Sequence, residues 1–578
     1  MIDPATLPPL LLPTPARLDL LAGDRVSTTT TPVFYDDPSL PSEGYHLRVH
    51  EDSGVSIVAA TPAGRLHGSR TLDQLRTQYP ASIPALAIED APALATRGVM
   101  LDVSRCRVPT MNALLAQTDL LGSLKYNHMQ LYIEHAFAYE GHEAVWAGSD
   151  PITPDELRRL DAHAASLAIE LAANQNCFGH MTRWLSLPEY SHLAETHDEF
   201  DFYAVPRRGP FSLCPTDPAS LVLIEDLLRQ QVACVSSGLV NIGCDETADI
   251  GAGRSRDAVD RHGRHRVYLD YVGAVCEIAE RLRARPMLWG DIALSGPEGA
   301  RALPERAIAL AWGYEPDSSF DDWGRSLAKS GRDWLACPGT SSWRSITGRT
   351  TERRQNLVAA VGAALRHGAE GILLTDWGDL GHRQQPPIAL LAIGEGAQAA
   401  WNPAAAPDPR AVSLHVFGDR SLQVAQWLAD LGDVDRQIRA TSGIPGDLAA
   451  PTPLRNASAL FELLHPSGAA NALPRYPQAW TDVLDRLTDL RKSCPVEEGP
   501  LLAVQLANSL DVAEFSATLA LHGLTETTDR AGDLHERLDE ILESHERLWA
   551  SDSRPGGLDE SLSFYESLRE RITRPTVA

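Results

Sequence analysis

The chain has 578 residues, of which 43% are hydrophobic and 22% are charged, with 51 lysines and arginines against 77 aspartates and glutamates. This length exceeds one ordinary hydrophobic core and indicates either several domains or a large barrel with attachments. The formal net charge of −26 opposes the neutralisation of phosphates that nucleic-acid binding requires. We therefore expect a globular protein without a nucleic-acid partner.

The eight cysteines are scattered and never form a Cys-x-x-Cys motif. Several lie in apolar runs, where cysteine behaves as a small hydrophobic residue, so neither a zinc knuckle nor a disulfide framework is indicated. Segment 1–20 lacks the basic start and the apolar stretch of a secretory signal, and no apolar run is long enough to cross a bilayer. We expect a cytoplasmic protein that has no membrane partner and needs no metal or other cofactor.

Residues 1–92 predict a small α/β domain. Segments 45–49 and 54–59 have strand-like composition and are joined by a glycine-containing turn, and leucines recur at helical spacing over 63–79. Because no titratable groups gather in this unit, we expect a supporting domain.

Residues 93–400 alternate short apolar runs with segments long enough for a crossover helix. We predict strands at 98–102, 128–133, 170–174, 238–242, 286–289, 307–312, 333–337 and 371–375. Crossover helices are expected over 112–124, 153–167, 219–236 and 267–284. This pattern is typical of an α/β fold of the (β/α)₈ TIM-barrel type, whose active site lies at the carboxyl ends of the strands.

Residues 401–578 predict an α-helical C-terminal domain. Helical periodicity runs over 414–438, 457–465, 479–491, 501–522 and 534–550. The charged segment 533–547 is typical of a solvated helix face. Little in this domain suggests chemistry, and its place in the molecule is open: it would either cover the barrel or join two chains as a homodimer.

The fourth predicted strand ends in two adjacent carboxylates. Segment 238–246 passes from buried-strand residues directly to Asp245 and Glu246. One interpretation is a strand cap in which these acids begin the next helix with Thr247. The other is catalytic, because one ionised and one protonated carboxyl group held close together are typical of enzymes that cleave glycosidic bonds.

The other strand ends carry further polar residues and several tryptophans. The candidates are Asp102, Arg105, Glu134, His135, Asn176, His180, Trp289, Asp291, Trp312, Glu315, Trp343, Asp376, Trp377 and Asp379. Aromatic faces stack on the apolar side of a sugar ring, while carboxylates and arginine bind its hydroxyls. A single tryptophan more often belongs to a core, but tryptophans after four consecutive strands favour a sugar-binding face.

Four motifs, in the expected order, resemble those of the family 20 glycoside hydrolases, the β-N-acetylhexosaminidases. They are segment 97–105, which resembles the first-strand motif ending in arginine; Phe178-Gly-His180, which resembles Pro-Gly-His; Gly243-Cys-Asp-Glu246, which resembles Gly-Gly-Asp-Glu; and Trp377-Gly-Asp379, which resembles Trp-Gly-Glu. The N-terminal unit, with 43–49 and 68–75, is similar to the family's non-catalytic domain.

The resemblance implies an exo-acting, retaining enzyme that releases terminal β-linked N-acetylglucosamine or N-acetylgalactosamine. In such enzymes the 2-acetamido oxygen of the substrate attacks C1 and forms an oxazolinium intermediate, so the protein supplies no nucleophile. Glu246 would act as general acid and then general base, and Asp245 would accept the acetamido N–H. Arg105 and Asp379 would hold ring hydroxyls, and His180 would support the two acids. Substrate-binding tryptophans under this resemblance are Trp289, Trp312, Trp343 and Trp377.

Several positions depart from the family pattern. Cys106 stands in place of a histidine, Cys244 in place of the second glycine, and Glu134 with His135 in place of an acidic pair. The tyrosine that often orients the acetamido group is not evident after the seventh strand, over 338–343. These departures suggest a divergent branch and leave the sugar and the aglycone open.

Three other functions remain as alternatives. A metal-dependent hydrolase on the same barrel would need convergent histidine and carboxylate ligands, which the strand ends do not show. A conventional retaining glycosidase would pair Glu246 with Glu134 or Asp379 as nucleophile. A non-catalytic carbohydrate-binding protein would keep the tryptophans but has no use for the adjacent acids.

Overall fold

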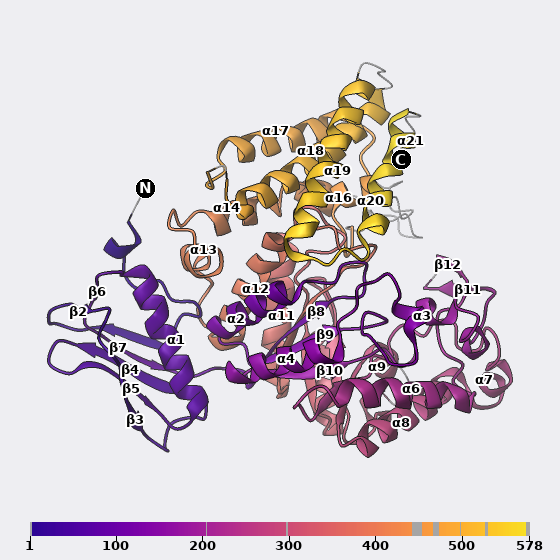
Figure 1. The fold of residues 1–578 in the computed structure, drawn as a ribbon, viewed down its shortest axis with the longest axis horizontal. Coiled ribbons are helices and arrows are strands. Elements are labelled where there is room, and N and C mark those ends of the chain that lie inside the picture. Colours follow the sequence, from indigo (N-terminus) through magenta and orange to yellow (C-terminus); the bar gives the residue numbers. More distant parts are fainter. Residues whose placement is uncertain are drawn as a thin grey trace.

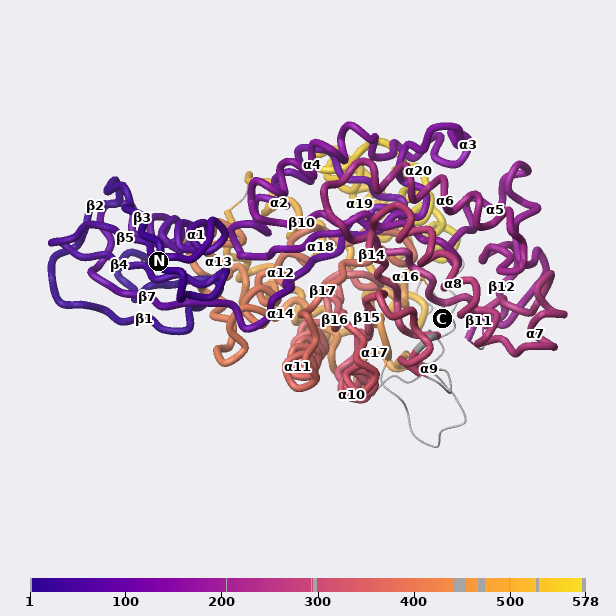
Figure 2. Tube along the Cα trace, turned by 90° about the horizontal axis from the view of Figure 1, so that it is seen from below, coloured from indigo at the N-terminus to yellow at the C-terminus, as the bar shows by residue number. Residues whose placement is uncertain are grey.

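The computed structural model describes residues 3–203, 205–295, 299–441, 454–465, 473–497, 499–525 and 530–573. Within these residues an N-terminal sheet domain, a central barrel and a C-terminal helical region follow one another along the chain (Figure 1). The sheet domain lies at one end of the long axis, and the yellow helices of the C-terminal region pack over the barrel. A second view again shows the sheet domain at one end of the long axis (Figure 2).

The N-terminal sheet has five strands in the order β1 (Arg17–Leu20), β7 (Leu86–Asp90), β4 (Tyr45–His50), β5 (Gly54–Ala59) and β3 (Val33–Asp36). In β4, Tyr45, Leu47 and Val49 are buried while their neighbours are not, because alternate side chains of a strand point to opposite faces. Helix α1 (Pro62–Gln78) packs on β4 and β5 and begins at Thr61, whose hydroxyl accepts the N–H of Gly64. The strands and the helix predicted here are confirmed. Strands β2 (Val26–Ser27) and β6 (Ser82–Ile83) form a separate pair.

Two buried cations tie this domain to the amino-terminal end of the barrel. Arg97 donates hydrogen bonds of 2.9 and 2.7 Å to the two carboxylate oxygens of Glu43 and a further one to the carbonyl of Lys125. The Nζ of Lys125 lies 3.2 Å from Asp90 and donates to the hydroxyl of Tyr45 at 2.9 Å. Both charges are therefore paired and hydrogen-bonded, which buried ions require.

Eight parallel strands close into the central barrel, and all eight predicted strands are confirmed. In sequence they are β8 (Thr96–Asp102), β9 (His128–Tyr132), β10 (Glu170–Asn174), β13 (Leu239–Asn241), β14 (Arg285–Trp289), β15 (Ile308–Trp312), β16 (Trp334–Cys337) and β17 (Gly371–Asp376). Each strand pairs in parallel with its predecessor, and β17 pairs with β8. The fold is therefore the (β/α)₈ barrel that the alternation predicts.

Helices surround the barrel and return the chain between the strands. The longer ones are α2 (Met111–Ser123), α4 (Pro154–Ser166), α6 (Pro218–Val232), α8 (Arg264–Arg281), α10 (Phe320–Ser330), α11 (Thr350–His367) and α12 (Pro386–Trp401). Helix α4 begins with a capping box, in which Thr153 and Glu156 each bond the other's backbone N–H. The short elements are α3 (Glu143–Trp146), α5 (Thr182–Leu185), β11 (Glu199–Phe202), β12 (Val205–Arg208), α7 (Arg256–His262) and α9 (Asp291–Ser295).

The inside of the barrel is filled by large side chains. A cluster that includes Met100, Tyr132, Trp289, Trp343 and Trp377 occupies this space, separate from the larger core between strands and helices. Because adjacent residues of a strand face opposite sides, Met100 points inward while its neighbours Val99 and Leu101 join the outer core. Bulky rings thus form the floor beneath the carboxyl ends of the strands.

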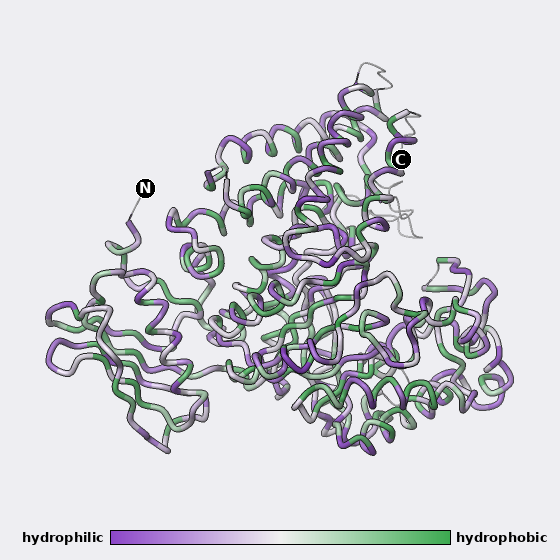
Figure 3. The backbone as a smooth tube through the Cα atoms, in the orientation of Figure 1, coloured by the Kyte–Doolittle hydropathy of each residue, from purple (hydrophilic) through white to green (hydrophobic). Residues whose placement is uncertain are grey.

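The C-terminal region is all-helical among its described residues. Its helices are α13 (Pro409–Phe417), α14 (Val424–Leu431), α15 (Arg436–Thr441), α16 (Ala459–Leu464), α17 (Pro477–Lys492), α18 (Leu501–Thr525), α19 (Ala531–Asp552), α20 (Leu558–Glu566) and α21 (Leu568–Thr573). Apolar and polar residues alternate along several of these helices (Figure 3). None of the helices in the described ranges combines the length and the apolar character needed to cross a membrane.

One prediction in this region is wrong: segment 414–438 is three helices rather than one. Gly418 adopts φ +65° and ends α13, and the carboxylate of Asp419 then accepts the N–H groups of Gln423 and Val424 to start α14. A glycine in the left-handed region commonly ends a helix. The apolar periodicity therefore continues across a turn in this segment. Helices α20 and α21 are additions that the periodicity did not predict.

The start of α20 is pressed against the barrel mouth. Arg107, in the loop after β8, pairs with Asp552 at 2.8 Å, and Arg554 donates to the carbonyls of Pro109 and Pro151. A side chain at Gly557 would place its Cβ 1.8 Å from the carbonyl oxygen of Cys106, so this close approach needs glycine. The helical region therefore covers part of the mouth and is fixed there.

Candidate active site

The loop after β13 turns sharply and presents the two adjacent acids. Gly243 adopts φ +66°, and a Cβ there would lie 1.8 Å from the amide oxygen of Asn176. Cys244 and Glu246 follow with φ of +72° and +52°, a region that residues other than glycine rarely adopt. Glycine would suit position 244 for this reason, yet the buried cysteine accepts the conformation. Backbone strain of this kind is typical of functional sites.

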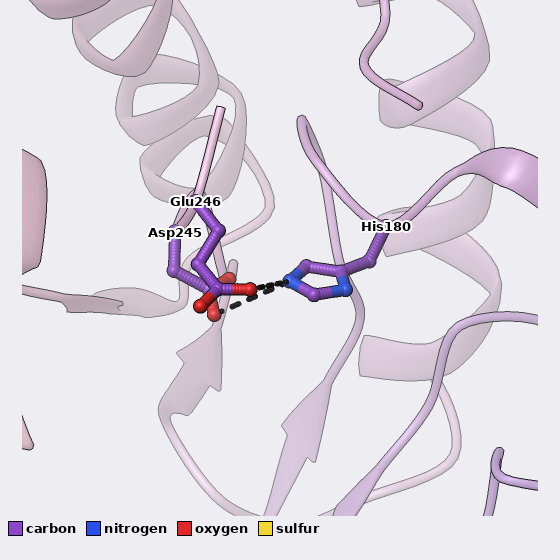
Figure 4. A group of neighbouring side chains, drawn as sticks. All are labelled: His180, Asp245 and Glu246. Carbon is purple, nitrogen blue, oxygen red and sulfur yellow. Dashed lines mark ion pairs between the residues drawn. The ribbon is translucent and has the colours of Figure 1, made fainter. Parts of the chain in front are cut away.

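Asp245 and Glu246 converge on one imidazole nitrogen of His180 (Figure 4). The Nε2 atom lies 3.5 Å from Oδ2 of Asp245 and 3.4 Å from Oε2 of Glu246, and Nδ1 lies 3.6 Å from Glu134. Burial disfavours a charged imidazole, but the carboxylates of Asp245 and Glu246 outweigh it and raise the pKa of His180 to about 10. The imidazole is therefore cationic at neutral pH.

The two acids differ in their access to solvent. The side chain of Glu246 is 28% exposed, whereas that of Asp245 is 9% exposed and one of its oxygens has no hydrogen-bond partner in the described chain. A buried carboxylate oxygen without a partner is costly unless a ligand satisfies it. This arrangement suits Glu246 for proton exchange and Asp245 for a fixed acceptor.

A third acid, Asp291 at the start of α9, lies behind this pair. One oxygen accepts the backbone N–H of Glu246 at 3.1 Å, and the other has no partner among the described residues. Burial and the nearby charge of Asp245 raise the pKa of Asp291 to about 8, so its carboxyl group holds a proton at neutral pH. The sequence indicates Asp291 as a candidate because it directly follows the strand end Trp289-Gly290.

Arg105 organises the opposite side of the mouth. Its guanidinium lies 2.6 Å from Asp102, 3.2 Å from Glu134 and 3.7 Å from Asp379. It also lies 4.8 Å from the ring centre of Tyr132. The structure thus brings Arg105 and Asp379 together, as predicted, and fixes the guanidinium with three carboxylates around it.

The tryptophans lie at different depths in the mouth. Trp377 contacts the rings of Tyr132 and Trp289, with centres 4.6 and 5.7 Å away, and its guanidinium neighbour Arg105 lies 5.3 Å from it. Trp289 is fully buried, and so is Trp343. The structure therefore places these two in the floor, where they support the pocket from below.

Tyr314 is the aromatic residue that sequence analysis missed. It lies two residues beyond β15, the sixth strand, and its hydroxyl accepts the indole N–H of Trp377 at 2.7 Å. Its ring stacks on Trp312 at 5.3 Å and meets Trp343 edge-on at 4.9 Å. The family's usual tyrosine is expected after strand seven, whereas Tyr314 follows strand six. Burial raises the pKa of Tyr314, so the phenol stays neutral and can donate a hydrogen bond.

His180, Asp245 and Glu246 also have ligand atoms within 4.8 Å of one another, close enough for a metal ion. A metal ligand must offer a lone pair, which a protonated imidazole lacks. The same three side chains also form a cation between two carboxylates, and this pairing accounts for their closeness without an ion.

A closed (β/α)₈ barrel with paired acids, an arginine and aromatic rings at its mouth defines the class of barrel glycoside hydrolases. The family comparison agrees: "Glycosyl hydrolase family 20, domain 2" matches residues 11–91, and "Glycosyl hydrolase family 20, catalytic domain" matches residues 95–343. The chain belongs to family 20 of the glycoside hydrolases. It is an enzyme of the β-N-acetylhexosaminidase type.

Known proteins resemble the chain over different spans. Hexosaminidase D of Bos taurus is 28% identical over 284 residues, which cover 45% of this chain and 77% of that protein. The structure of an exo β-N-acetylglucosaminidase from Vibrio harveyi with N-acetylglucosamine has a TM-score of 0.59 at 16% identity, covering 73% and 78% of the two chains. A chitobiase structure from Flavobacterium johnsoniae has a TM-score of 0.58 at 15% identity, covering 97% and 99%. The likeness of folds therefore extends into the helical region.

Proposed function

We propose that the protein is an exo-acting, retaining enzyme that hydrolyses terminal β-linked N-acetylglucosamine or N-acetylgalactosamine with assistance from the substrate's own acetamido group. The observation that carries this proposal is the convergence of Asp245 and Glu246 on one nitrogen of His180. An enzymic nucleophile and its acid partner face each other across the anomeric carbon. In this proposal the two acids act from one side of the sugar and leave the attack on C1 to the substrate.

In the first step the acetamido oxygen forms a bond to C1 while the bond from C1 to the leaving oxygen breaks. Glu246 gives its proton to the leaving oxygen, since it is the more exposed of the two acids. Asp245 accepts the acetamido N–H with its unpartnered oxygen and balances the positive charge that develops on the ring.

In the second step a water molecule attacks C1 on the face that the leaving group vacated. Glu246, now ionised, takes the proton of the water, and the bond between C1 and the acetamido oxygen breaks. The two inversions give net retention. Protonated His180 places a positive charge beside Asp245 and Glu246, while protonated Asp291 avoids a third negative charge beside the pair.

The same geometry supports the binding roles proposed for the surrounding residues. Arg105 and Asp379 hold the ring hydroxyls, and Trp377 offers the aromatic face, with Trp289 below it. Tyr314 and Trp312 form the wall beside Trp377 and are positioned to contact the acetamido group. The net charge of −26 supports an uncharged carbohydrate rather than a polyanion as partner.

A comparison of chromogenic substrates tests the proposal. We expect para-nitrophenyl β-glycosides of N-acetylglucosamine or N-acetylgalactosamine to be turned over at least about a hundredfold faster than para-nitrophenyl β-glucoside, because only the first two carry the attacking group. Equal rates would favour a conventional retaining glycosidase that uses Glu134 or Asp379 as nucleophile. Sugar binding without turnover would favour a binding protein.

A further inference from the structure

A small buried cavity lies between α11, α12, α14 and the loop after β16. Its volume is about 10 Å³, which is the room that one water molecule or one ion of similar size needs. Thr347 and Arg349 of the loop and Arg353 of α11 line it, and apolar side chains of α12 and α14 form the rest of the wall. The three polar residues are only 1–2% exposed, so solvent does not satisfy their side chains.

Three polar atoms of this lining have no hydrogen-bond partner in the described chain. They are Oγ1 of Thr347, Nε of Arg349 and Nη2 of Arg353. A buried donor without a partner loses its bonds to water and gains none in return, and native proteins leave few such groups. Three of them around a cavity for one particle indicate an occupant that accepts hydrogen bonds.

The chemistry of these donors favours an anion over a water molecule. A guanidinium group only donates hydrogen bonds, and it keeps its positive charge in proteins. A water molecule would accept from both arginines, but of the three unpartnered atoms only the hydroxyl oxygen of Thr347 could accept one of its own two hydrogens. A halide ion accepts from all three donors, and its bonds to the two cations are charge-assisted.

The carboxylates near these arginines leave the cavity free. Arg349 binds Glu315 at 2.8 Å and Arg353 binds Glu395 at 2.6 Å, in each case through Nη1. Neither glutamate lines the cavity, and no other carboxylate among the described residues does. An anion in the cavity would therefore meet donors and apolar groups, which meets the requirement that a buried charge be paired and hydrogen-bonded.

The cavity is connected to the wall of the active site through Arg349. The partner of this arginine, Glu315, directly follows Tyr314 in the loop after β15. From α11, the amide of Asn356 donates to the carbonyls of Gly313 and Glu315, at 2.9 Å each, on both sides of Tyr314. An ion that fixes Arg349 beside the start of α11 therefore also fixes the loop that carries Tyr314.

We propose that this cavity binds one halide ion, chloride in ordinary salt solutions, and that the bound ion raises activity by holding the loop of Tyr314 in place. The binding of the ion is independent of the proposed function, whereas its effect on rate rests on that function. The small volume excludes polyatomic anions such as gluconate.

The test replaces sodium gluconate by sodium chloride at constant ionic strength, with the whole chain in solution. A ligand that binds only the folded state stabilises it by mass action, so the thermal midpoint should rise by about 2–4 °C and level off by about 100 mM chloride. Over the same range kcat/KM on para-nitrophenyl β-N-acetylglucosaminide should rise by about threefold or more, because the wall is better positioned. Sodium bromide should reproduce both effects.

The possible outcomes separate the ion site from the reaction. Equal midpoints in chloride and gluconate would show that the cavity holds water and would overturn the inference. A midpoint that responds to chloride while kcat/KM does not would overturn the effect on activity. A midpoint that responds in a protein that cleaves no amino-sugar glycoside would support the ion site and contradict the proposed function.

Thr347→Val connects the response to this cavity, because it removes one donor and nearly preserves the volume. The half-saturating chloride concentration should rise by about tenfold, the effect of losing one hydrogen bond to an ion. The matched control is Thr77→Val in α1, which removes an exposed hydroxyl that donates to the carbonyl of Asp73 at 2.9 Å and should leave the chloride response unchanged. Equal half-saturation in the wild type and Thr347→Val would place the ion elsewhere.

A crystallographic measurement needs no variant. Crystals of the wild type grown in sodium bromide should show an anomalous bromide peak in contact with Thr347, Arg349 and Arg353. Bromide peaks at the surface alone would overturn the inference.

Discussion

The barrel carries a cluster of buried charges at each end, and the two clusters are built differently. At the amino end, Arg97 and Lys125 each have carboxylate partners, Glu43 and Asp90, with hydrogen bonds to nearly every available atom. Trp401 also donates to Asp90 at 2.9 Å. Each of these two cations has its own carboxylate, and the protein itself satisfies the pairs without a ligand.

At the mouth, acids outnumber bases. Two cations, Arg105 and His180, stand among six carboxyl groups: Asp102, Glu134, Asp245, Glu246, Asp291 and Asp379. One oxygen each of Asp245 and Asp291 has no hydrogen-bond partner in the described chain. Left-handed backbone at His180 and Glu246, with φ of +58° and +52°, adds strain.

The contrast between the two charge clusters indicates that the cluster at the amino end serves stability and the cluster at the mouth serves function. In barrels of this kind, residues at the amino ends of the strands mainly stabilise the fold, whereas the carboxyl ends carry catalysis. A matched cluster lowers the energy of the folded state, while an excess of like charge costs stability and shifts pKa values, as active sites require. Changes at the mouth should therefore cost more in rate than in stability, and changes at the amino end should do the reverse.

The largest expected effect on activity is that of Glu246→Gln. The loss of the proton donor should lower kcat/KM by about 10²–10⁴-fold on glycosides with poor leaving groups, and by much less on dinitrophenyl glycosides, which need no protonation. The thermal midpoint should stay at the wild-type value. A uniform loss on both kinds of substrate would assign the acid to another residue.

The largest expected effect on stability is that of Arg97→Ala. Removing one partner of a buried ion pair leaves Glu43 without its countercharge and should cost about 3–5 kcal/mol in urea unfolding. The folded variant should keep kcat/KM within about twofold, because the change lies at the far end of the barrel from the acids. Arg158→Ala, which breaks an exposed pair with Asp155 at 2.6 Å, is the control and should cost about 0.5 kcal/mol or less. Similar losses in both variants would contradict the account.

His180→Gln should remove a pH dependence of stability. The pKa of His180 is about 10 in the folded protein against 6.5 ordinarily, so the folded state binds the extra proton between these values. The stabilisation is complete below about pH 6.5 and is lost as the pH rises towards 10. Thermal midpoints measured across this window should fall more steeply for the wild type than for the variant. Parallel curves would mean that the imidazole is neutral.

The smallest expected effect is that of Tyr314→Phe. The variant loses the hydroxyl that accepts the indole N–H of Trp377 at 2.7 Å, which should cost about 1 kcal/mol and lower kcat/KM by about tenfold. A loss confined to the acetamido substrate would support contact between this wall and the acetamido group. A wild-type value of kcat/KM would restrict Tyr314 to packing.

The barrel and the acid pair are predictable because they depend on local order. Apolar runs such as 371–375 alternate with helical segments, and the acids follow directly after a strand. The shared nitrogen of His180 is not predictable, since it depends on how β10 and β13 sit side by side. The role of Tyr314 was not predicted for a similar reason, because the contact between the loops after β15 and β17 depends on the folded barrel.

The C-terminal helical region also shows what sequence periodicity can and cannot predict. Periodicity predicts α17, α18 and α19, whose apolar stripes are long, but it joins α13, α14 and α15 across Gly418. Helix α20 is short, and its place over the mouth depends on contacts made by Gly557 and Arg554 with distant loops. This placement therefore emerges only from the fold.

The most direct test of the contrast between the two clusters is the thermal midpoint of Asp245→Asn, measured beside its kcat/KM on para-nitrophenyl β-N-acetylglucosaminide. We predict a midpoint lowered clearly less than that of Arg97→Ala, because the lost attraction to His180 is partly offset by the lost repulsion from Glu246, together with a loss of at least about a hundredfold in kcat/KM. A midpoint lowered as far as that of Arg97→Ala, with activity retained, would show that the acids at the mouth serve the fold and would contradict the account.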